Sequence, residues 1–274
     1  MNTFEHWKDK FINAAYVGEF VENVKRINPD KNQFAIFWLG QAGFLIKTSD
    51  GNTIAIDPCL SDYCERRTGF KRLIPPICRP EEFCCDILLI SHEHEDHFDE
   101  DLIKIMSHSM HYKEIWGPKS IIPLIKKLGI GSKFKCLEYR KTKYLSDIKI
   151  TPIFSDHGTQ VSDAMGFLFD IGNVQLYYAG DTCLSQKLKE EIQDLHPDIA
   201  IMPINGEFGN LNSSEAYELA EQIGCRALIP CHYWMYAEHG GLPLDLLRTA
   251  KDRDLPKVVY LALGEGWIVE KEML

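Results

Sequence analysis

Features that would place this chain outside a reducing compartment are missing from its sequence. No apolar run is long enough to span a membrane, and residues 1–10 contain no apolar core followed by a small-residue cleavage site. The nine cysteines form no Cys-x-x-Cys pair, which argues against a zinc ribbon or a thioredoxin-type redox site. Scattered cysteines without a pairing pattern are typical of reducing compartments, so we expect a cytoplasmic protein.

Positive charge is also scarce. The chain has 30 Lys and Arg against 40 Asp and Glu, which leaves a net charge of -10. Nucleic acids and anionic membranes both attract positive surfaces, so we expect neither as a partner. A small anionic substrate is still compatible, because a local basic pocket can override the total charge. No low-complexity linker divides the 274 residues, so we expect one domain over 1–274.

The hydrophobic pattern predicts alternating strands and helices. The expected strands are 34–38, 44–47, 53–56, 87–90, 148–154, 166–171, 174–178, 199–202 and 227–229, with a hairpin turn at 171–174. The expected helices are 100–106, 121–128, 185–195 and 213–223. Aromatic and apolar residues at roughly helical spacing from Phe4 to Ile27 also predict an N-terminal helical extension, about 1–28.

The order of these elements favours one fold class. A set of strand hairpins is followed by alternating helix and strand, and then the same pattern begins again. Two such halves can stack as two sheets with helices outside. We therefore predict an α/β protein, an αββα four-layer sandwich of two mixed β-sheets with outer helices.

One short run, His92-Glu93-His94-Glu95-Asp96-His97, is the most informative part of the chain. It follows the apolar strand 87–90. Side chains alternate along an extended segment, so His92 and His94 point the same way, and Asp96 and His97 follow where the chain turns. Histidine and carboxylate together are the usual ligands of hydrolytic metal centres. The run predicts hydrolysis at a divalent metal centre.

Ligand-type residues stand at four further strand ends. His157 follows the strand 148–154, Asp181 follows 174–178, and His232 follows 227–229. Asp57 ends the strand 53–56. A rigid sheet can direct such residues into a shared cleft. Packing histidines would have to produce these coincidences independently, so we expect all four residues near the six-residue run.

In these motifs, from Phe34 to Trp267, the sequence resembles the metallo-β-lactamase superfamily. The resemblance implies that one ion is held by His92, His94 and His157, and the other by Asp96, His97 and His232. It implies that Asp181 bridges both ions and that Asp57 supports the ligands from behind. Asp96, Asp181 and His232 are then the expected catalytic residues. The resemblance implies one or two divalent ions, Mn²⁺ or Zn²⁺, and His94, where flavodiiron-type members have Glu, favours hydrolysis over redox chemistry.

Four loop segments, 56–62, 69–76, 202–206 and 230–233, look like the L-ascorbate-6-phosphate lactonase branch of that superfamily. The resemblance implies opening of a phosphorylated sugar lactone, in which a metal-bound hydroxide attacks the carbonyl. It also implies a possible homo-oligomer. The residues expected to contact this small anionic substrate are Arg66, Arg67, Lys71, Arg72, Asn205 and Tyr233.

For each of those substrate residues a plainer role competes. Any single basic residue of the 66–72 loop is more often a solvated charge, a tyrosine such as Tyr233 more often packs, and Asn205 precedes a helix start whose capping explains it equally well. His6, His108, His111, His196 and His239 have no partners at motif spacing, so we expect surface or packing roles for them. Two other functions stay open: a phosphodiesterase or nuclease on the same fold, and a non-catalytic metal or ligand sensor.

Overall fold

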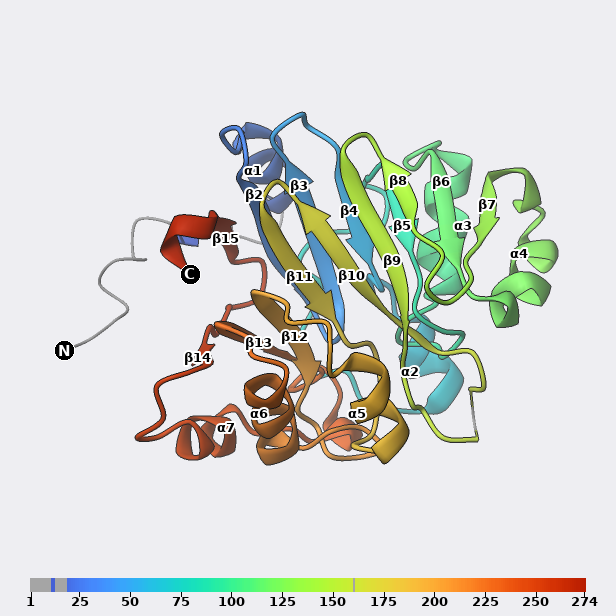
Figure 1. Cartoon of the computed structure of the whole chain (residues 1–274). Helices are drawn as coiled ribbons and strands as arrows, with labels where there is room; N and C mark the ends of the chain where they lie inside the picture. The colour runs from blue at the N-terminus through green and yellow to red at the C-terminus, as the bar shows by residue number, and fades with distance from the viewer. Residues whose placement is uncertain (1–10, 13–18, 160) are drawn as a thin grey trace.

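Two β-sheets lie face to face at the centre of the molecule (Figure 1). The computed structural model describes residues 11–12, 19–159 and 161–274. The first sheet has the order β1-β15-β2-β3-β4-β5-β6-β7. Its strands are β1 (Phe11–Ile12), β2 (Phe34–Gly40), β3 (Gly43–Thr48), β4 (Thr53–Ile56), β5 (Ile87–Leu89), β6 (Glu114–Gly117), β7 (Phe134–Cys136) and β15 (Gly266–Val269).

The second sheet repeats this plan and has the order β14-β13-β12-β11-β10-β9-β8. Its strands are β8 (Lys143–Leu145), β9 (Ile148–Phe154), β10 (Met165–Ile171), β11 (Val174–Tyr178), β12 (Ile199–Pro203), β13 (Ala227–Cys231) and β14 (Lys257–Val258). In each sheet antiparallel hairpins lead into parallel strands: β4, β5, β6 and β7 are parallel in the first, and β11 to β14 in the second. The predicted turn at 171–174 joins β10 to β11.

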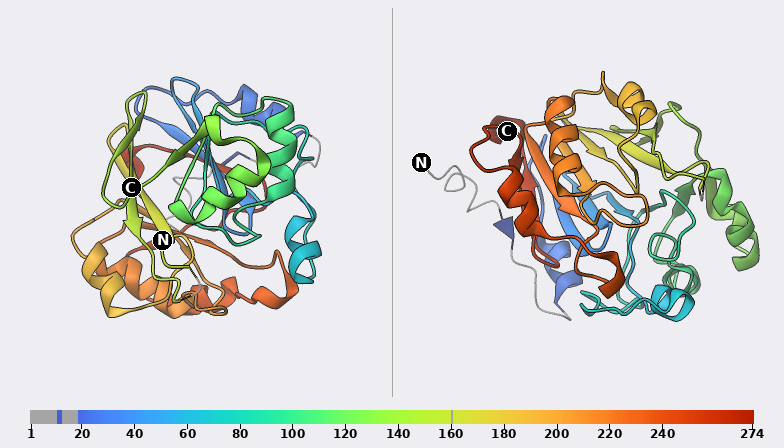
Figure 2. Two further views of the ribbon diagram at one scale, coloured as in Figure 1. Left: turned by 90° about the vertical axis from the view of Figure 1, so that its right-hand side faces the viewer. Right: turned by 90° about the horizontal axis from the view of Figure 1, so that it is seen from below.

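Helices cover the outer face of each sheet (Figures 1 and 2). The helices are α1 (Phe20–Arg26), α2 (Tyr63–Thr68), α3 (Glu100–His108), α4 (Ile122–Leu128), α5 (Gln186–Ile192), α6 (Ser213–Gln222) and α7 (Pro243–Thr249). Apolar residues of α1, α3 and α4 pack on the first sheet, and those of α5, α6 and α7 pack on the second. The predicted αββα sandwich is confirmed. In the described part of the chain, no helix combines the length and apolar composition that a membrane crossing needs.

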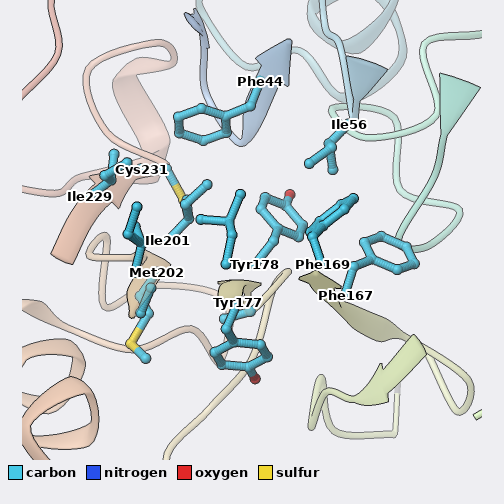
Figure 3. Packing of buried hydrophobic residues seen from close by; sticks show 14 of the residues in the cluster. Phe44, Ile56, Phe167, Phe169, Tyr177, Tyr178, Ile201, Met202, Ile229 and Cys231 are labelled. Atoms are coloured by element: carbon cyan, nitrogen blue, oxygen red, sulfur yellow. The ribbon is translucent and has the colours of Figure 1, made fainter. Parts of the chain in front are cut away.

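Strand β2 shows how the central layers form. Its seven residues are all buried, and they alternate between two cores: Phe34 and Ile36 face the second sheet, whereas Ala35 and Phe37 face the outer helices. A strand covered on both faces therefore reads as a continuous apolar run. Between the sheets, side chains such as Phe44 of the first sheet meet Tyr178 of the second (Figure 3).

The structure corrects the expected elements in places. Phe11–Ile12 forms β1 and pairs with β15, so the helical prediction is wrong at these two residues, while α1 confirms it at Phe20–Arg26. Most of the remaining expected N-terminal helix lies outside the described residues. Arg66 and Arg67 lie in α2, where a loop was expected. Strands β6, β7, β8, β14 and β15 and helix α7 escaped prediction because two to seven residues carry little periodic signal.

Candidate metal centre

The centre lies where strands of both sheets end. Neighbouring parallel strands β4 and β5 finish at the same edge of the first sheet, and β9, β11 and β13 run in one direction in the second. Each of these five strands is followed within three residues by a ligand-type or supporting side chain. The packing of one sheet on the other brings the two sets together, as the sequence predicted.

Asp57 supports this centre from behind. Its carboxylate is fully buried and accepts hydrogen bonds from the Ser91 backbone N–H (2.8 Å), the Ser91 hydroxyl (2.5 Å) and the Tyr178 hydroxyl (2.7 Å). Its Oδ2 also lies 2.8 Å from His97 Nδ1. This contact suits a ring proton on His97 Nδ1, and Nε2 then faces the centre as the atom that a metal ion would bind.

Three histidines form the first ligand group. His92 Nε2 and His157 Nε2 each lie 3.1 Å from His94 Nδ1. The Ser91 hydroxyl holds the other side of the His92 ring at Nδ1, at 2.9 Å. Burial lowers the pKa of both His92 and His157, which keeps these rings in the neutral form that binds metal.

Asp181 lies between the two halves of the centre. Its Oδ1 is 3.3 Å from His97 Nε2, and its Oδ2 is 3.3 Å from His232 Nε2 and 3.9 Å from His157 Nε2. Asn210 donates a hydrogen bond to Oδ2 at 2.9 Å. Burial favours the neutral acid, but His232 and His97 outweigh it, so the pKa of Asp181 lies well below its usual value.

A second group consists of Asp96, His232 and His239, whose ligand atoms all lie within 4.8 Å of one another. Asp96 Oδ2 is 3.2 Å from His232 Nε2 and 3.8 Å from His239 Nδ1. His239 is 3 % exposed, which excludes the surface role and agrees with the packing role that the sequence allowed. Its side chain also lines the same hollow as several motif residues. The residues lining this hollow are Cys64, Thr68, Phe70, His94, Glu95, Asp96, His157, Asp181, Phe208, His232 and His239. Ion pairing with Asp181 overcomes burial and raises the pKa of His232 to about 9.

The donor set fits divalent ions. Nitrogens that share one ion at about 2.0–2.1 Å must lie roughly 3 to 3.5 Å apart, and the first histidine group has this spacing. Within the described chain, the buried atoms Asp181 Oδ1 and His97 Nε2 have no hydrogen-bond partner. Buried polar atoms are rarely left in this state unless something else binds them. Seven predicted ligands, His92, His94, Asp96, His97, His157, Asp181 and His232, are thus brought together.

The residues predicted for substrate lie in different places. Arg72 is 8 % exposed, and its guanidinium donates to the carbonyls of Cys59 (3.2 Å) and Ser61 (2.7 Å) and to the Tyr236 hydroxyl (3.1 Å). This buried arginine holds two loops together and does not line the hollow. The expectation that Arg72 binds substrate is therefore not supported by its position.

The other basic residues are exposed. Arg66 pairs with Asp101, and Lys71 Nζ lies 3.0 Å from Glu65. Arg67 alone of the four pairs with a residue of the hollow, since its Nε is 3.9 Å from Glu95 Oε1.

Tyr233 and Asn205 also lie outside the hollow. Tyr233 is buried and stacks on Trp38, with ring centroids 4.9 Å apart. The Asn205 side chain donates to the Glu207 carbonyl at 3.2 Å and lines a neighbouring groove. The competing capping interpretation of the following residues is confirmed, because Asn212 and Glu215 form a capping box at the start of α6.

Sequence inspection missed two members of the centre, Gln41 and His239. Gln41 lies in the turn between β2 and β3 with a positive φ of 50° and is fully buried. Its Nε2 is 2.8 Å from Asp96 Oδ2 and 2.5 Å from His239 Nδ1. The available signals were weak: a polar residue between two glycines of an apolar hairpin, and a histidine seven residues beyond His232.

Comparison with known proteins agrees with this geometry. A model of the Beta-lactamase superfamily domain matches residues 35–232, a span that begins before Asp57 and ends at His232. The chain belongs to this superfamily. A UPF0173 metal-dependent hydrolase of Methanobrevibacter smithii is 30% identical over 210 residues, which are 72% of this chain and 81% of the relative. The chain therefore also belongs to the UPF0173 family.

Two further comparisons cover most of the chain. A UPF0173 metal-dependent hydrolase of Polynucleobacter asymbioticus is 26% identical over 252 residues, 84% of each chain. The solved structure of Igni18, a novel metallo hydrolase from Ignicoccus hospitalis, has a TM-score of 0.68 at 22% identity and covers 87% of this chain and 99% of that chain. The last comparison supports the fold.

Asp57→Asn tests the supporting role of this residue. Asparagine tolerates the positive φ of 42° at this position, so the turn is kept. The NH₂ group of the asparagine, however, would face groups that donate hydrogen bonds to Asp57 in the wild type. The His97 ring would then lose the carboxylate acceptor that orients it. We expect metal affinity to fall about 10- to 100-fold, measured by calorimetric titration of metal-stripped protein. Asp147→Asn, at an exposed position, is the control, and an unchanged affinity in Asp57→Asn would contradict the role.

Proposed function

We propose that this chain is a metal-dependent hydrolase that opens a small lactone. The convergence of seven ligand-type side chains, five of which line one hollow, is the observation that carries the proposal. The UPF0173 relatives are themselves named metal-dependent hydrolases, which supports the reaction class. The lactone rests on the resemblance of segments 56–62, 69–76, 202–206 and 230–233 to the lactonase branch.

The hollow suits a small ring. Its volume is about 180 Å³, roughly six times the share of one liquid water. The rings of Phe70 and Phe208, 5.4 Å apart, both contact His239 and form an aromatic wall above the second ligand group. Such a wall can pack against the face of a five- or six-membered ring while its carbonyl faces the ligands.

A lactone is an activated ester, so opening it needs a nucleophile and stabilisation of the charge that develops on the carbonyl oxygen. When bound, divalent ions would polarise this carbonyl and lower the pKa of a water molecule. Asp96 Oδ2 and Asp181 both face the hollow beside His232, so they can orient a water and accept its proton. His232, between the two carboxylates, keeps them in position.

A phosphate group on the substrate would have to lie at the opening of the hollow. Among the residues that the structure describes, no Lys or Arg lines the hollow itself. Of the four predicted basic residues, Arg67 is the one that forms an ion pair with a residue lining it, Glu95. We therefore assign the phosphate contact to Arg67 and no longer to Arg66, Lys71 or Arg72.

A substrate panel tests the proposal. Metal-stripped protein is reconstituted with Mn²⁺ or Zn²⁺ and assayed on sugar lactones with and without phosphate, on simple esters and on a phosphodiester. We expect lactone turnover to exceed phosphodiester turnover at least about a hundredfold, or 2.7 kcal/mol in the barrier. Faster phosphodiester cleavage would favour the phosphodiesterase hypothesis, and no turnover of any compound would favour the sensor.

Arg67→Gln tests the phosphate assignment. An exposed arginine that contacts phosphate contributes about 1 kcal/mol, so we expect KM for a phosphorylated lactone to rise about fivefold. The KM for the same lactone without phosphate should not change. Arg66→Gln, one residue earlier in α2 and paired with Asp101, is the matched control. Equal effects on both substrates would contradict a phosphate contact.

A further inference from the structure

His239 occupies a position that its packing alone does not explain. It lies in the short helix η4 (Ala237–His239), and the rings of Phe70, Phe208 and Tyr236 surround it. Its ring also stacks on His232, with centroids 4.9 Å apart and an angle of 16°. If His239 were held only by these aromatic rings, its ring nitrogens would not need to face particular polar groups. Here Nδ1 is directed at Asp96 and Gln41.

Three acceptor-type atoms converge on one point in this region. A single donor nitrogen, Gln41 Nε2, lies 2.8 Å from Asp96 Oδ2, 3.1 Å from His232 Nε2 and 2.5 Å from His239 Nδ1. The ligand atoms of Asp96, His232 and His239 also lie within 4.8 Å of one another. Gln41 Nε2 fills part of the space between them and also lies 3.3 Å from His232 Nδ1, so one cation can meet the three ligand atoms when the Gln41 amide turns aside.

We propose that His239 is an additional ligand of the second metal ion, which it shares with Asp96 and His232. The proposal rests on the proposed function only in assuming that ions occupy the hollow. A set enlarged by one nitrogen suits an ion with a high coordination number better than a four-coordinate structural zinc. His239 also presents its ring to Phe70 and Phe208, so the ligand connects the second ion to the aromatic wall.

Two substitutions separate a ligand role from a packing role. His239→Phe keeps an aromatic ring against Phe70 and Phe208 but removes the ligand atom. His239→Glu keeps a ligand atom and loses the ring. If His239 only packs, the phenylalanine variant should resemble the wild type more closely; if it binds metal, the glutamate variant should.

The readout is metal binding, independent of any substrate. Metal-stripped proteins are titrated with Mn²⁺ by calorimetry, bound ions are counted by mass spectrometry, and the visible absorption of Co²⁺-loaded protein reports the ligand number. We expect two ions in the wild type, a second-ion affinity at least about tenfold lower in His239→Phe, and recovery to within about threefold in His239→Glu. Tight retention of the first ion in both variants shows that the fold is intact.

His108→Phe, an exposed histidine at the end of α3, is the matched control and should bind both ions as the wild type does. A second ion bound by His239→Phe with wild-type affinity, or a wild-type protein that never binds more than one ion, would overturn the proposal. Because ions are counted without substrate, absence of lactone turnover would remove only the proposed function.

Discussion

Replacing Asp181 with asparagine is expected to lower kcat/KM for the lactone at least about a thousandfold. Asp181 Oδ2 is 3.9 Å from His157 of the first ligand group and 3.3 Å from His232 of the second, so its carboxylate is placed to join the two groups. Asparagine keeps the shape and can still meet Asn210, but it removes the negative charge that offsets two divalent ions. The loss should appear mainly in kcat, because Asp181 faces the ligands and not the aromatic wall.

Asp170→Asn is the matched control for this prediction. Asp170 lies on β10, outside the hollow, where it accepts a hydrogen bond from Gln175 at 2.8 Å. It should keep wild-type activity. Circular dichroism and the retained metal content show whether Asp181→Asn still folds. Activity within tenfold of the wild type in a folded Asp181→Asn protein would remove Asp181 from the catalytic machinery.

Most of the fold could be predicted because burial on both faces leaves a clear sequence pattern. Strands such as β2, with seven buried residues, read as continuous apolar runs. Asp57, Asp181 and His232 each break such a run with one polar residue, and a polar residue at the end of a buried strand must lie at a sheet edge. This is why these residues could be expected to lie together before any geometry was known, whereas their roles as ligands were implied by the family resemblance.

Residues placed by turns could not be assigned in the same way. Gln41 enters the centre because the β2–β3 turn holds it at a positive φ, and His239 enters because the chain doubles back after His232. In a strand, side chains alternate between the two faces, so the sequence shows which way a residue near the strand end points. In a turn, the direction of a side chain depends on backbone dihedral angles, and many different sequences adopt the same angles. The sequence therefore indicated the candidate ligands that follow strand ends and missed the neighbouring residues that turns place beside them.

The positions of the basic residues could not be predicted for a related reason. Arg66, Arg67, Lys71 and Arg72 look alike in the sequence, yet Arg72 is buried with three oxygen partners while Arg66 is paired on the surface. An arginine satisfies its donors with whatever carbonyls the loops bring close. Which basic residue reaches the hollow is thus decided by tertiary packing, and composition does not show it.

Removing the metal is expected to abolish activity and to lower the melting temperature. Ions that bind only the folded chain stabilise it by about 2.7 kcal/mol when present at a hundred times their Kd. For a chain of this length that corresponds to a shift of roughly 5–10 °C. Without ions, the His92, His94 and His157 rings meet only through two N···N contacts of 3.1 Å, so a bound ion would add the bonds that hold this group together.

The measurement is a thermal melt and an assay before and after chelation and gel filtration, followed by addition of Mn²⁺ or Zn²⁺. We expect activity to fall at least about a thousandfold and to return with the added ion, together with the melting temperature. His92→Ala, which removes one ligand of the first group, should melt near the chelated wild type and respond little to chelator. Full activity in protein with no measurable metal would show that the converging ligands serve another purpose, because neither Asp96 nor Asp181 alone could activate water to that extent.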